Sequence, residues 1–270
     1  MIEPFLKWAG GKRWLVNQYG FHFPNEYSRY IEPFLGGGAV FFWLCPKVSI
    51  LADVNEELIN AYTQVKCSPK YIEEELQKCQ QLHSARFYID QRTNTPKNIL
   101  DRAVRFIYLN RTCWNGLYRV NLRGQFNVPI GTKNIVEYPP GYLQKVSSRL
   151  KEAEIISSDF ERVIDMAQNG DFVYADPPYT VAHNTNNFIK YNSKLFSWQD
   201  QIRLCRATER AARRGATVMV SNADHQCIRE LYNQIGICHR VHRTSKLAAD
   251  TNYRISTTEL LISVTSLSCK

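Results

Sequence analysis

The chain has 270 residues, of which 44% are hydrophobic, 12% aromatic and 22% charged, and its formal net charge at pH 7 is +9. These values are typical of globular proteins and exclude disordered, collagen-like and coiled-coil classes. The longest apolar run, residues 39–45, is too short to cross a bilayer, and Glu3 and Pro4 do not fit a secretory signal. We therefore expect a cytoplasmic protein without a membrane partner, built as one large domain or one domain with an insertion.

The first predicted elements are a strand, a glycine turn and a helix. Residues 28–34 predict the strand, glycines 36 to 38 the turn, and residues 39–44 an apolar helix. This order begins a nucleotide-binding α/β unit. A second strand over residues 49–52 leads into Asp53, which lies 17 residues after Gly36 and close to where a carboxylate that binds ribose hydroxyls is expected.

The middle of the chain is strongly basic. It follows a predicted helix over residues 55–65 and includes two more over residues 69–82 and 98–110. Residues 86–133 contain nine Lys or Arg and two Asp, a local net charge of +7, interleaved with tyrosines, Trp114 and Phe126. This pattern favours a surface that follows phosphates, with a solvated basic face as the alternative. Residues 114–130 predict a loop and a β-hairpin that turns at Arg123 and Gly124.

Strands and helices alternate again in the last part of the chain. Predicted strands cover residues 154–157, 171–175, 216–221 and 255–264, and predicted helices cover residues 162–167 and 197–214. Ser197 and Asp200 indicate a capping box at the start of the second helix, and Gly215 ends it. This order predicts an α/β fold with a mostly parallel sheet and one inserted region.

Metal chemistry is not indicated by the cysteines or histidines. The eight cysteines form no CxxC pair and no zinc-type Cys/His spacing, so we expect reduced thiols. His239 and His242 have no third ligand close in sequence, and we expect no metal.

The segment Asp176-Pro177-Pro178-Tyr179 is the sharpest chemical signal. It follows the predicted strand Phe172 to Ala175, at the end of the strand where α/β folds bind ligands. The prolines make the turn stiff, and the Pro177 carbonyl is a pure acceptor. Together with Asp176 it can accept both hydrogens of a planar amino group, while Tyr179 stacks on the ring that bears this group. A purely structural Asp-Pro-Pro turn is the alternative.

Four motifs occur in one order along the chain. They are residues 5–12 (FLKWAGGK), 31–38 (IEPFLGGG), 108–131 (YLNR, WNGL, then R to FNVPIG) and 176–179 (DPPY). With these motifs the sequence resembles the Dam-type DNA adenine-N6 methyltransferases, the alpha-group or D12 class. The resemblance implies a Rossmann-like S-adenosylmethionine-dependent methyltransferase sheet with an inserted helical plus β-hairpin DNA-recognition domain. We assign residues 1–60 and 150–270 to the catalytic domain and residues 61–149 to the target-recognition insertion.

The resemblance also assigns roles to residues. S-adenosylmethionine, with S-adenosylhomocysteine as product, would be bound by Trp8, Lys12, Phe34, Gly36, Asp53, Asp159 and Asp176. A helix N-cap explains Asp159 equally well. Catalysis falls to Asp176, Pro177, Pro178 and Tyr179, which would act on an adenine flipped out of double-stranded DNA. Acceptors at the amino group would favour a tetrahedral nitrogen and stabilise the positive charge that develops there.

DNA contacts are carried over in the same way. The resemblance implies that Arg119 reads guanine, Leu117 and Pro129 contact a thymine methyl group, Asn115 lies near the space left by the flipped base, and Lys7 is a second base reader. Phosphate contacts are implied for Arg111, Asn121 and Asn127. The expected target is GATC, although Thr132 stands where GATC members often have a basic residue, with Lys133 as its substitute.

Other parts of the match are less specific. Phe188 and Tyr191 follow DPPY in a polar loop that either closes on the flipped base or packs as apolar residues. Arg254 and the run from Glu259 match the family's terminal hairpin. We expect a monomeric bacterial or phage-encoded enzyme, of which restriction-modification is one context.

Three alternatives stay open. The first is an RNA or protein amino-group methyltransferase, which uses a similar D/N-P-P-Y segment but lacks the hairpin block. The second is a catalytically silent DNA-binding relative. The third is a nicotinamide-linked dehydrogenase, which the missing G-x-G-x-x-G spacing disfavours.

Overall fold

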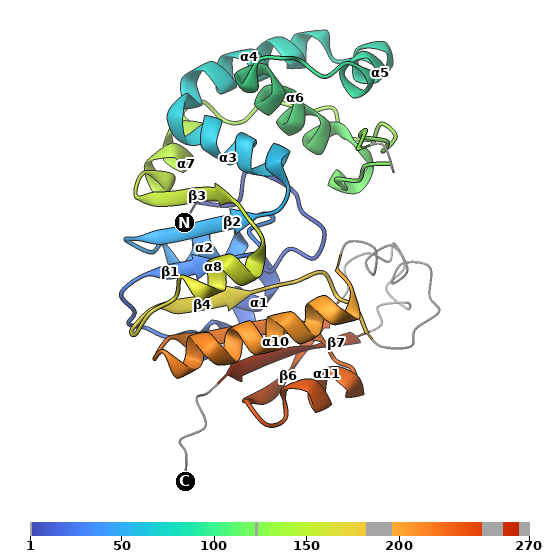
Figure 1. Ribbon diagram of the computed structural model, residues 1–270. Helices are drawn as coiled ribbons and strands as arrows, with labels where there is room; N and C mark the ends of the chain where they lie inside the picture. Colours follow the sequence, from blue (N-terminus) through green and yellow to red (C-terminus); the bar gives the residue numbers. More distant parts are fainter. Residues whose placement is uncertain (1, 122–123, 182–195, 245–255, 265–270) are drawn as a thin grey trace. The chain divides into compact units, whose positions relative to one another are not determined.

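The computed structural model describes residues 2–121, 124–181, 196–244 and 256–264 (Figure 1). The chain divides into two compact units. The first unit consists of residues 1–12, 36–45 and 55–157, and the second of residues 13–35, 46–54 and 158–270. The segments alternate along the sequence, so neither unit is a continuous stretch of chain.

The described strands confirm the predicted α/β fold. They form one seven-stranded sheet in the order β3-β2-β1-β4-β5-β7-β6. The pairs β1–β2, β1–β4 and β4–β5 are parallel, whereas β7 runs antiparallel to both β5 and β6. The strands are β1 (Tyr30–Glu32), β2 (Ser49–Asp53), β3 (Ala153–Ser157), β4 (Phe172–Ala175), β5 (Thr217–Ala223), β6 (Gly236–Thr244) and β7 (Ser256–Val264).

Helices cover the sheet within the second unit. All four residues of β4 are buried, as expected of a parallel strand with both faces covered. Helices α8 and α10 lie side by side, and α10 packs on β5 (Figure 1). The helical elements of this unit are α1 (Arg13–Tyr19), η1 (Gly20–His22), α8 (Phe160–Asp165), α10 (Trp198–Arg213) and α11 (Gln226–Tyr232).

The ends of α10 follow from local chemistry. The Asp200 backbone N–H donates to Ser197 Oγ at 3.2 Å, and the Ser197 N–H donates to the Asp200 carboxylate at 2.9 Å. This reciprocal pair confirms the predicted capping box. Gly215 has φ +91°, a backbone conformation that favours glycine, at the position directly after the helix.

The first unit is mostly helical. Helix α3 packs against α6 and α7, and α4 packs against the same two helices. Helix α6 is the most deeply buried of these, since residues 106–110 are all buried. The helical elements are α2 (Ala39–Leu44), α3 (Glu56–Cys67), α4 (Pro69–Leu82), α5 (Ala85–Thr93), α6 (Ile99–Thr112), η2 (Trp114–Gly116) and α7 (Tyr142–Leu150).

The segment predicted as a β-hairpin pairs only weakly. Val120 and Phe126 form an isolated antiparallel bridge, and Cys113 and Ile130 form another. The Asn127 N–H donates to the Arg119 carbonyl at 3.2 Å, so the chain reverses as expected without forming regular strands. Leu122 and Arg123, at the predicted turn, lie outside the described residues.

Several elements differ from the sequence prediction. Strand β1 ends at Glu32 instead of residue 34, because Pro33 has no N–H to donate to the ladder. Helices α1, α5, α7 and α11 and strand β6 were not predicted.

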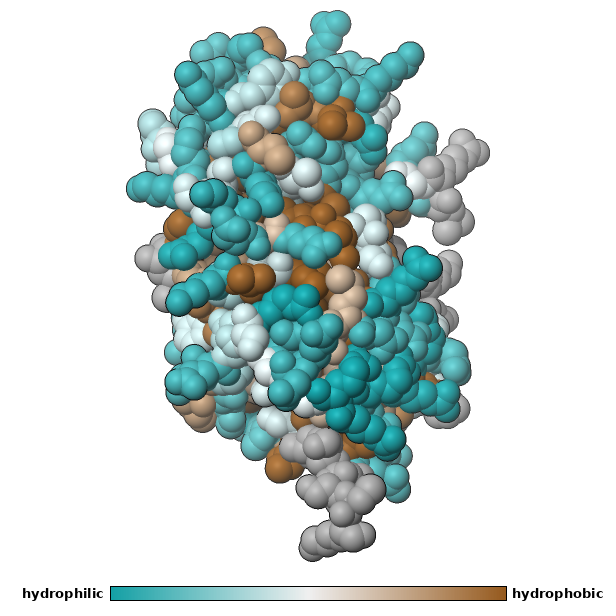
Figure 2. All heavy atoms as spheres, turned by 60° about the vertical axis from the view of Figure 1, so that its left-hand side comes forward, coloured by the Kyte–Doolittle hydropathy of each residue, from teal (hydrophilic) through white to brown (hydrophobic). Residues whose placement is uncertain are grey.

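Among the described residues no helix is both long and apolar enough to span a bilayer. Hydrophilic side chains cover most of the face in Figure 2.

Candidate functional site

The DPPY segment lies where β4 ends in the second unit. Ala175 pairs with Val220 of the parallel strand β5, and Asp176 begins the turn that follows. Pro177 is buried, while Asp176, Pro178 and Tyr179 are half-buried. The proline pair cannot continue the ladder, so the carboxylate and the ring are presented at the carboxyl edge of the parallel strands.

Tyr179 is held through its hydroxyl. The hydroxyl donates to Glu259 Oε2 of β7 at 2.7 Å. Burial raises the pKa of Tyr179 well above its usual value, and the charges of Asp176 and Glu259 add to this shift. The phenol is therefore protonated at neutral pH and acts as a hydrogen-bond donor.

The chain that leaves the DPPY segment is also held. Thr180 Oγ1 donates to the Phe196 carbonyl at 2.7 Å. The amide of Gln201, which is fully buried, donates to the Thr180 carbonyl at 3.3 Å and pairs with the side chain of Asn222. These bonds connect the turn to α10 and β5 and make it stiff on its C-terminal side.

Two further predicted cofactor carboxylates, besides Asp176, lie in the second unit. Asp53 is half-buried at the end of β2. Asp159 caps α8, because its Oδ1 accepts from the Glu161 N–H at 3.0 Å, which confirms the N-cap explanation. The same oxygen accepts from Arg203 Nη2 at 2.8 Å.

Aromatic rings lie beside Asp159. The ring of Phe34 stacks on Phe160 with centroids 5.3 Å apart and meets the edge of Phe196 at 5.6 Å. The Arg203 guanidinium lies 4.8 Å from the Phe160 ring centroid. The second unit therefore offers apolar rings next to a carboxylate, a combination that suits a planar base with an exocyclic amine.

The remaining predicted cofactor residues lie in the first unit. Gly36 has φ +46°, and a Cβ there would lie 2.6 Å from Trp8 Cδ1, so the glycine allows the indole to approach the turn. Trp8 in turn stacks with Tyr118, with ring centroids 5.8 Å apart. Lys12 is 4% exposed, and its ammonium donates to the Gly10 carbonyl at 3.0 Å.

Lys7 is held by a buried asparagine of the same unit. Its backbone N–H donates to Asn110 Oδ1 at 2.9 Å, and its carbonyl accepts from Asn110 Nδ2 at 2.7 Å. The same Nδ2 donates to the Gly116 carbonyl at 3.4 Å. Asn110 thus connects the N-terminal motif to η2.

The Lys7 ammonium lies in a positive environment. Burial lowers the pKa of Lys7, and the charges of Lys133 and Arg111 lower it further. Arg111 donates to the Glu137 carbonyl at 2.9 Å and lies 3.9 Å from the Tyr138 ring centroid. The structure therefore brings Lys7, Arg111 and Lys133 together, which suits an anionic partner.

The other predicted DNA contacts lie on the same unit, and all but Asn121 are exposed. Arg119 Nε donates to Asn127 Oδ1 at 3.0 Å, and Asn121 Nδ2 donates to Gln125 Oε1 at 3.0 Å. Asn115 has φ 55°, a left-handed conformation that asparagine tolerates. The exposed residues are Asn115, Leu117, Arg119, Asn127 and Pro129, with Asn121 half-buried.

Not every Lys or Arg side chain of residues 86–133 is available to a partner. Arg105 is 8% exposed and donates to the carbonyls of Gln91 and Arg92. Arg102 forms an ion pair with Glu57. The sequence therefore overstates the surface charge of this segment.

Sequence reasoning missed Asn110, Glu259 and Arg203 as side chains that hold other site residues. The available signal was polarity in an apolar context, since Asn110 follows Leu109 in a buried helix and Glu259 precedes three apolar residues of β7. Phe188, Tyr191 and Arg254 lie outside the described residues.

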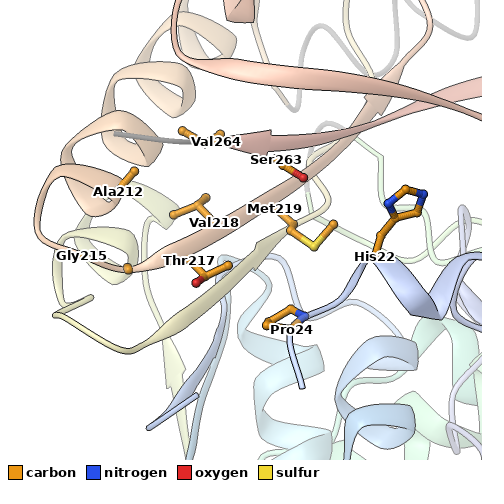
Figure 3. A pocket seen from close by; sticks show the side chains of 10 residues that line it. His22, Pro24, Ala212, Gly215, Thr217, Val218, Met219, Ser263 and Val264 are labelled. Atoms are coloured by element: carbon orange, nitrogen blue, oxygen red, sulfur yellow. The ribbon is translucent and has the colours of Figure 1, made fainter. Parts of the chain in front are cut away.

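A hollow of about 400 Å³ lies elsewhere in the second unit (Figure 3). It is lined by Thr217, the first residue of β5, together with His22 and Val264. Thr217 pairs with Phe172, the first residue of β4, whereas Asp176 follows the last. The hollow is therefore at the amino edge of the parallel strands and is not part of the DPPY site. No group of three metal-ligating side chains occurs within the described ranges.

Comparison with known proteins places this arrangement in a family. Residues 8–246 match the model of the D12 class N6 adenine-specific DNA methyltransferases. The chain is 38% identical to the Type II methyltransferase M1.LlaDCHI of Lactococcus lactis subsp. cremoris over 97% of this chain and 95% of that protein. It is 39% identical to the Type II methyltransferase M.MjaIII of Methanocaldococcus jannaschii over 82% and 84% of the two chains.

A further relative is the DNA adenine methylase of Vibrio cholerae, which is 35% identical over 84% of each chain. Among solved structures, a precorrin-6y C5,15-methyltransferase from Geobacter metallireducens covers 48% of this chain and 70% of its own at 12% identity, with a TM-score of 0.23 that supports no argument.

The α/β sheet with a DPPY turn is thus that of a methyltransferase. The chain belongs to the D12 class N6 adenine-specific DNA methyltransferases. It is a DNA adenine methyltransferase, and its family implies S-adenosylmethionine as the cofactor.

Proposed function

We propose that this enzyme acts as a monomer on double-stranded DNA and methylates the N6 atom of an adenine within GATC after flipping that base out of the helix. The observation that carries the proposal is the DPPY turn, in which Asp176 follows a buried strand and Tyr179 is fixed by its hydroxyl. The target atom is inaccessible inside a duplex, so the base must leave the stack to reach this turn.

The residues of the turn act by alignment and electrostatics. The Asp176 carboxylate and the Pro177 carbonyl accept the two hydrogens of the adenine amino group. These contacts favour a tetrahedral nitrogen whose lone pair leaves the ring conjugation, and they stabilise the positive charge that grows on it. The Tyr179 ring supplies the surface on which the flipped base stacks, which keeps the nitrogen aligned.

The carboxylates and aromatic rings of the site fit S-adenosylmethionine. Half-buried carboxylates accept hydrogens from ribose hydroxyls and from an adenine amine, and apolar rings stack on a purine. We assign this binding to Phe34, Asp53 and Asp159 in the second unit and to Trp8, Lys12 and Gly36 in the first, with Asp176 as a further contact. When bound, the cofactor supplies an electrophilic methyl group.

Sequence recognition is assigned to the first unit, which contains the proposed target-recognition region, residues 61–149, and also Lys7. Arg119 reads guanine, Leu117 and Pro129 contact a thymine methyl group, and Lys7 is a second base reader. Arg111, Asn121 and Asn127 contact phosphates, and Asn115 lies near the space left by the flipped base. Lys133 lies close to Lys7, which supports Lys133 as the substitute for the basic residue that GATC members often have at the position of Thr132.

The test is to incubate the protein with S-adenosylmethionine and unmethylated plasmid DNA and to map modified adenines by single-molecule sequencing. We expect N6-methyladenine at GATC and nowhere else. Methylation at another sequence would overturn the GATC assignment and leave the chemistry standing. No methylated adenine, with cofactor binding shown by calorimetry, would overturn the DNA substrate and favour an RNA or protein amino group.

A further inference from the structure

A buried carboxylate of the last described strand is bonded to the catalytic turn. Glu259 is 7% exposed, and its Oε2 accepts from the Tyr179 hydroxyl at 2.7 Å. Its Oε1 accepts from Arg243 Nη1 of β6 at 3.3 Å. A charge in this environment is costly unless it is paired, and these two contacts give each oxygen of the Glu259 side chain a partner.

The register of the sheet explains why this contact forms. Glu259 pairs with Ala223, the last residue of β5, and β5 runs parallel to β4. Because β7 runs antiparallel to β5, the beginning of β7 lies at the carboxyl ends of β4 and β5, where the DPPY turn begins. Arg243 reaches Glu259 diagonally, since Glu259 pairs with Val241 two residues away on β6.

The bond to Glu259 restricts the ring of Tyr179. A tyrosine ring can move by rotation about its side-chain bonds, and a fixed hydroxyl removes most of that freedom. A hydrogen bond from a neutral hydroxyl to a carboxylate is stronger than one between neutral groups. The ring is therefore presented in one orientation before any base arrives, which reduces the entropic cost of stacking.

We propose that Glu259 is a positioning residue that sets the stacking surface of Tyr179 for the flipped adenine. This inference rests on the proposed function and names a residue that acts on the same site through Tyr179. Glu259 contributes to alignment of the base and not to DNA affinity, since phosphate and base-edge contacts are assigned to the other unit.

The test uses a DNA duplex with 2-aminopurine at the adenine that sequencing shows to be methylated. The fluorescence of this base is quenched when it stacks on a tyrosine ring. We expect Glu259→Ala to lower kcat about 10-fold, to leave the KM for DNA within about 2-fold, and to raise the fluorescence of the bound duplex. Tyr179→Phe, which keeps a stacking ring and removes the hydroxyl, should show the same fall in kcat.

Two further variants separate positioning from a purely structural ion pair. Glu259→Gln keeps an oxygen that accepts from the Tyr179 hydroxyl but loses the charge that pairs with Arg243. We expect it to retain quenching and most of kcat. The double variant Tyr179→Phe with Glu259→Ala should be no worse than either single variant, because both remove the same bond.

A matched control is Tyr30→Phe. The Tyr30 hydroxyl donates to Glu32 Oε2 at 2.9 Å, so this variant also removes a buried tyrosine–glutamate bond from the same sheet. We expect its kcat and fluorescence to equal those of the unmodified enzyme. If Glu259→Ala does not fold, Tyr179→Phe and Glu259→Gln carry the test.

The outcomes separate this inference from the proposed function. If the unmodified enzyme methylates DNA adenine while Tyr179→Phe keeps its kcat, the inference is overturned and the function stands. If Glu259→Gln behaves like Glu259→Ala and Tyr179→Phe behaves like the unmodified enzyme, Glu259 has only a structural role. If no DNA adenine is methylated, both proposals are overturned.

Discussion

At the scale of single residues, Asp176 tests the proposed chemistry most directly. Asp176→Ala removes an acceptor of the adenine amino group, and we expect kcat to fall by at least about 100-fold. The turn itself should persist, because the prolines and the Thr180 bonds remain. Circular dichroism and a DNA gel shift should therefore match the unmodified enzyme. The control is Glu230→Ala, which removes an exposed carboxylate on α11 and should keep full activity. Turnover by Asp176→Ala would disprove the role assigned to Asp176.

Arg119 provides a second test at this scale. Its Nε bond to Asn127 orients the guanidinium, which suits a bidentate contact with guanine. We expect Arg119→Ala to reduce discrimination at one base pair by about 1 to 3 kcal/mol, while nonspecific binding changes little. The measurement is kcat/KM on the cognate duplex and on duplexes with one base pair changed. An unaltered selectivity profile would show that another side chain reads that base.

At the scale of elements, Asn110 stabilises the contact between the N-terminal motif and α6. It is fully buried, and Asn110→Ala would leave the Lys7 N–H and carbonyl without these partners. We expect a loss of about 2 to 4 kcal/mol in the free energy of unfolding, since an unsatisfied buried group costs about 1 to 3 kcal/mol. Urea unfolding measures this loss. Asn94→Ala, at an exposed helix end, should cost less than about 1 kcal/mol.

Elements set by local chemistry could be predicted from the sequence. Pro69 in the first turn of α4, the Ser197 and Asp200 pair of α10 and the glycines before α2 each specify an element boundary over a few residues. Strand β6 could not be predicted in this way. Its histidines and arginines are tolerated because it is the last strand in the sheet order, where one edge has no neighbouring strand among the described residues.

In the candidate site, too, features set by neighbouring residues could be predicted from the sequence and contacts between distant segments could not. The DPPY turn is contiguous, and a strand followed by two prolines indicates its position without any tertiary information. The bond between Tyr179 and Glu259 joins residues 80 positions apart, and it depends on the register of two antiparallel strands. No sequence pattern within either segment specifies that register, so the contact could only be found in the structure.

At the scale of the whole molecule, the charge that acts on DNA is smaller than the sequence total. Arg102 is paired with Glu57 and Arg105 is buried, so neither guanidinium is available to a phosphate, whereas Lys7, Arg111 and Lys133 lie together. If Lys133 contacts a phosphate, we expect Lys133→Ala to reduce the slope of log affinity against log salt by about 0.9. Fluorescence anisotropy over a salt series measures the slope. Lys78→Gln, an exposed lysine paired with Glu75, should leave it unchanged.

The order of the sheet also bears on synthesis of the protein. Strand β7 lies between β5 and β6, so neither of those strands has its antiparallel neighbour until residues 256–264 have left the ribosome. The hydrogen bond from the Tyr179 hydroxyl also forms only after this strand is in place, because Glu259 accepts it. Until residues 256–264 are added, the edge of β5 that pairs with β7 stays uncovered, and an unpaired strand edge makes a folding intermediate prone to aggregation.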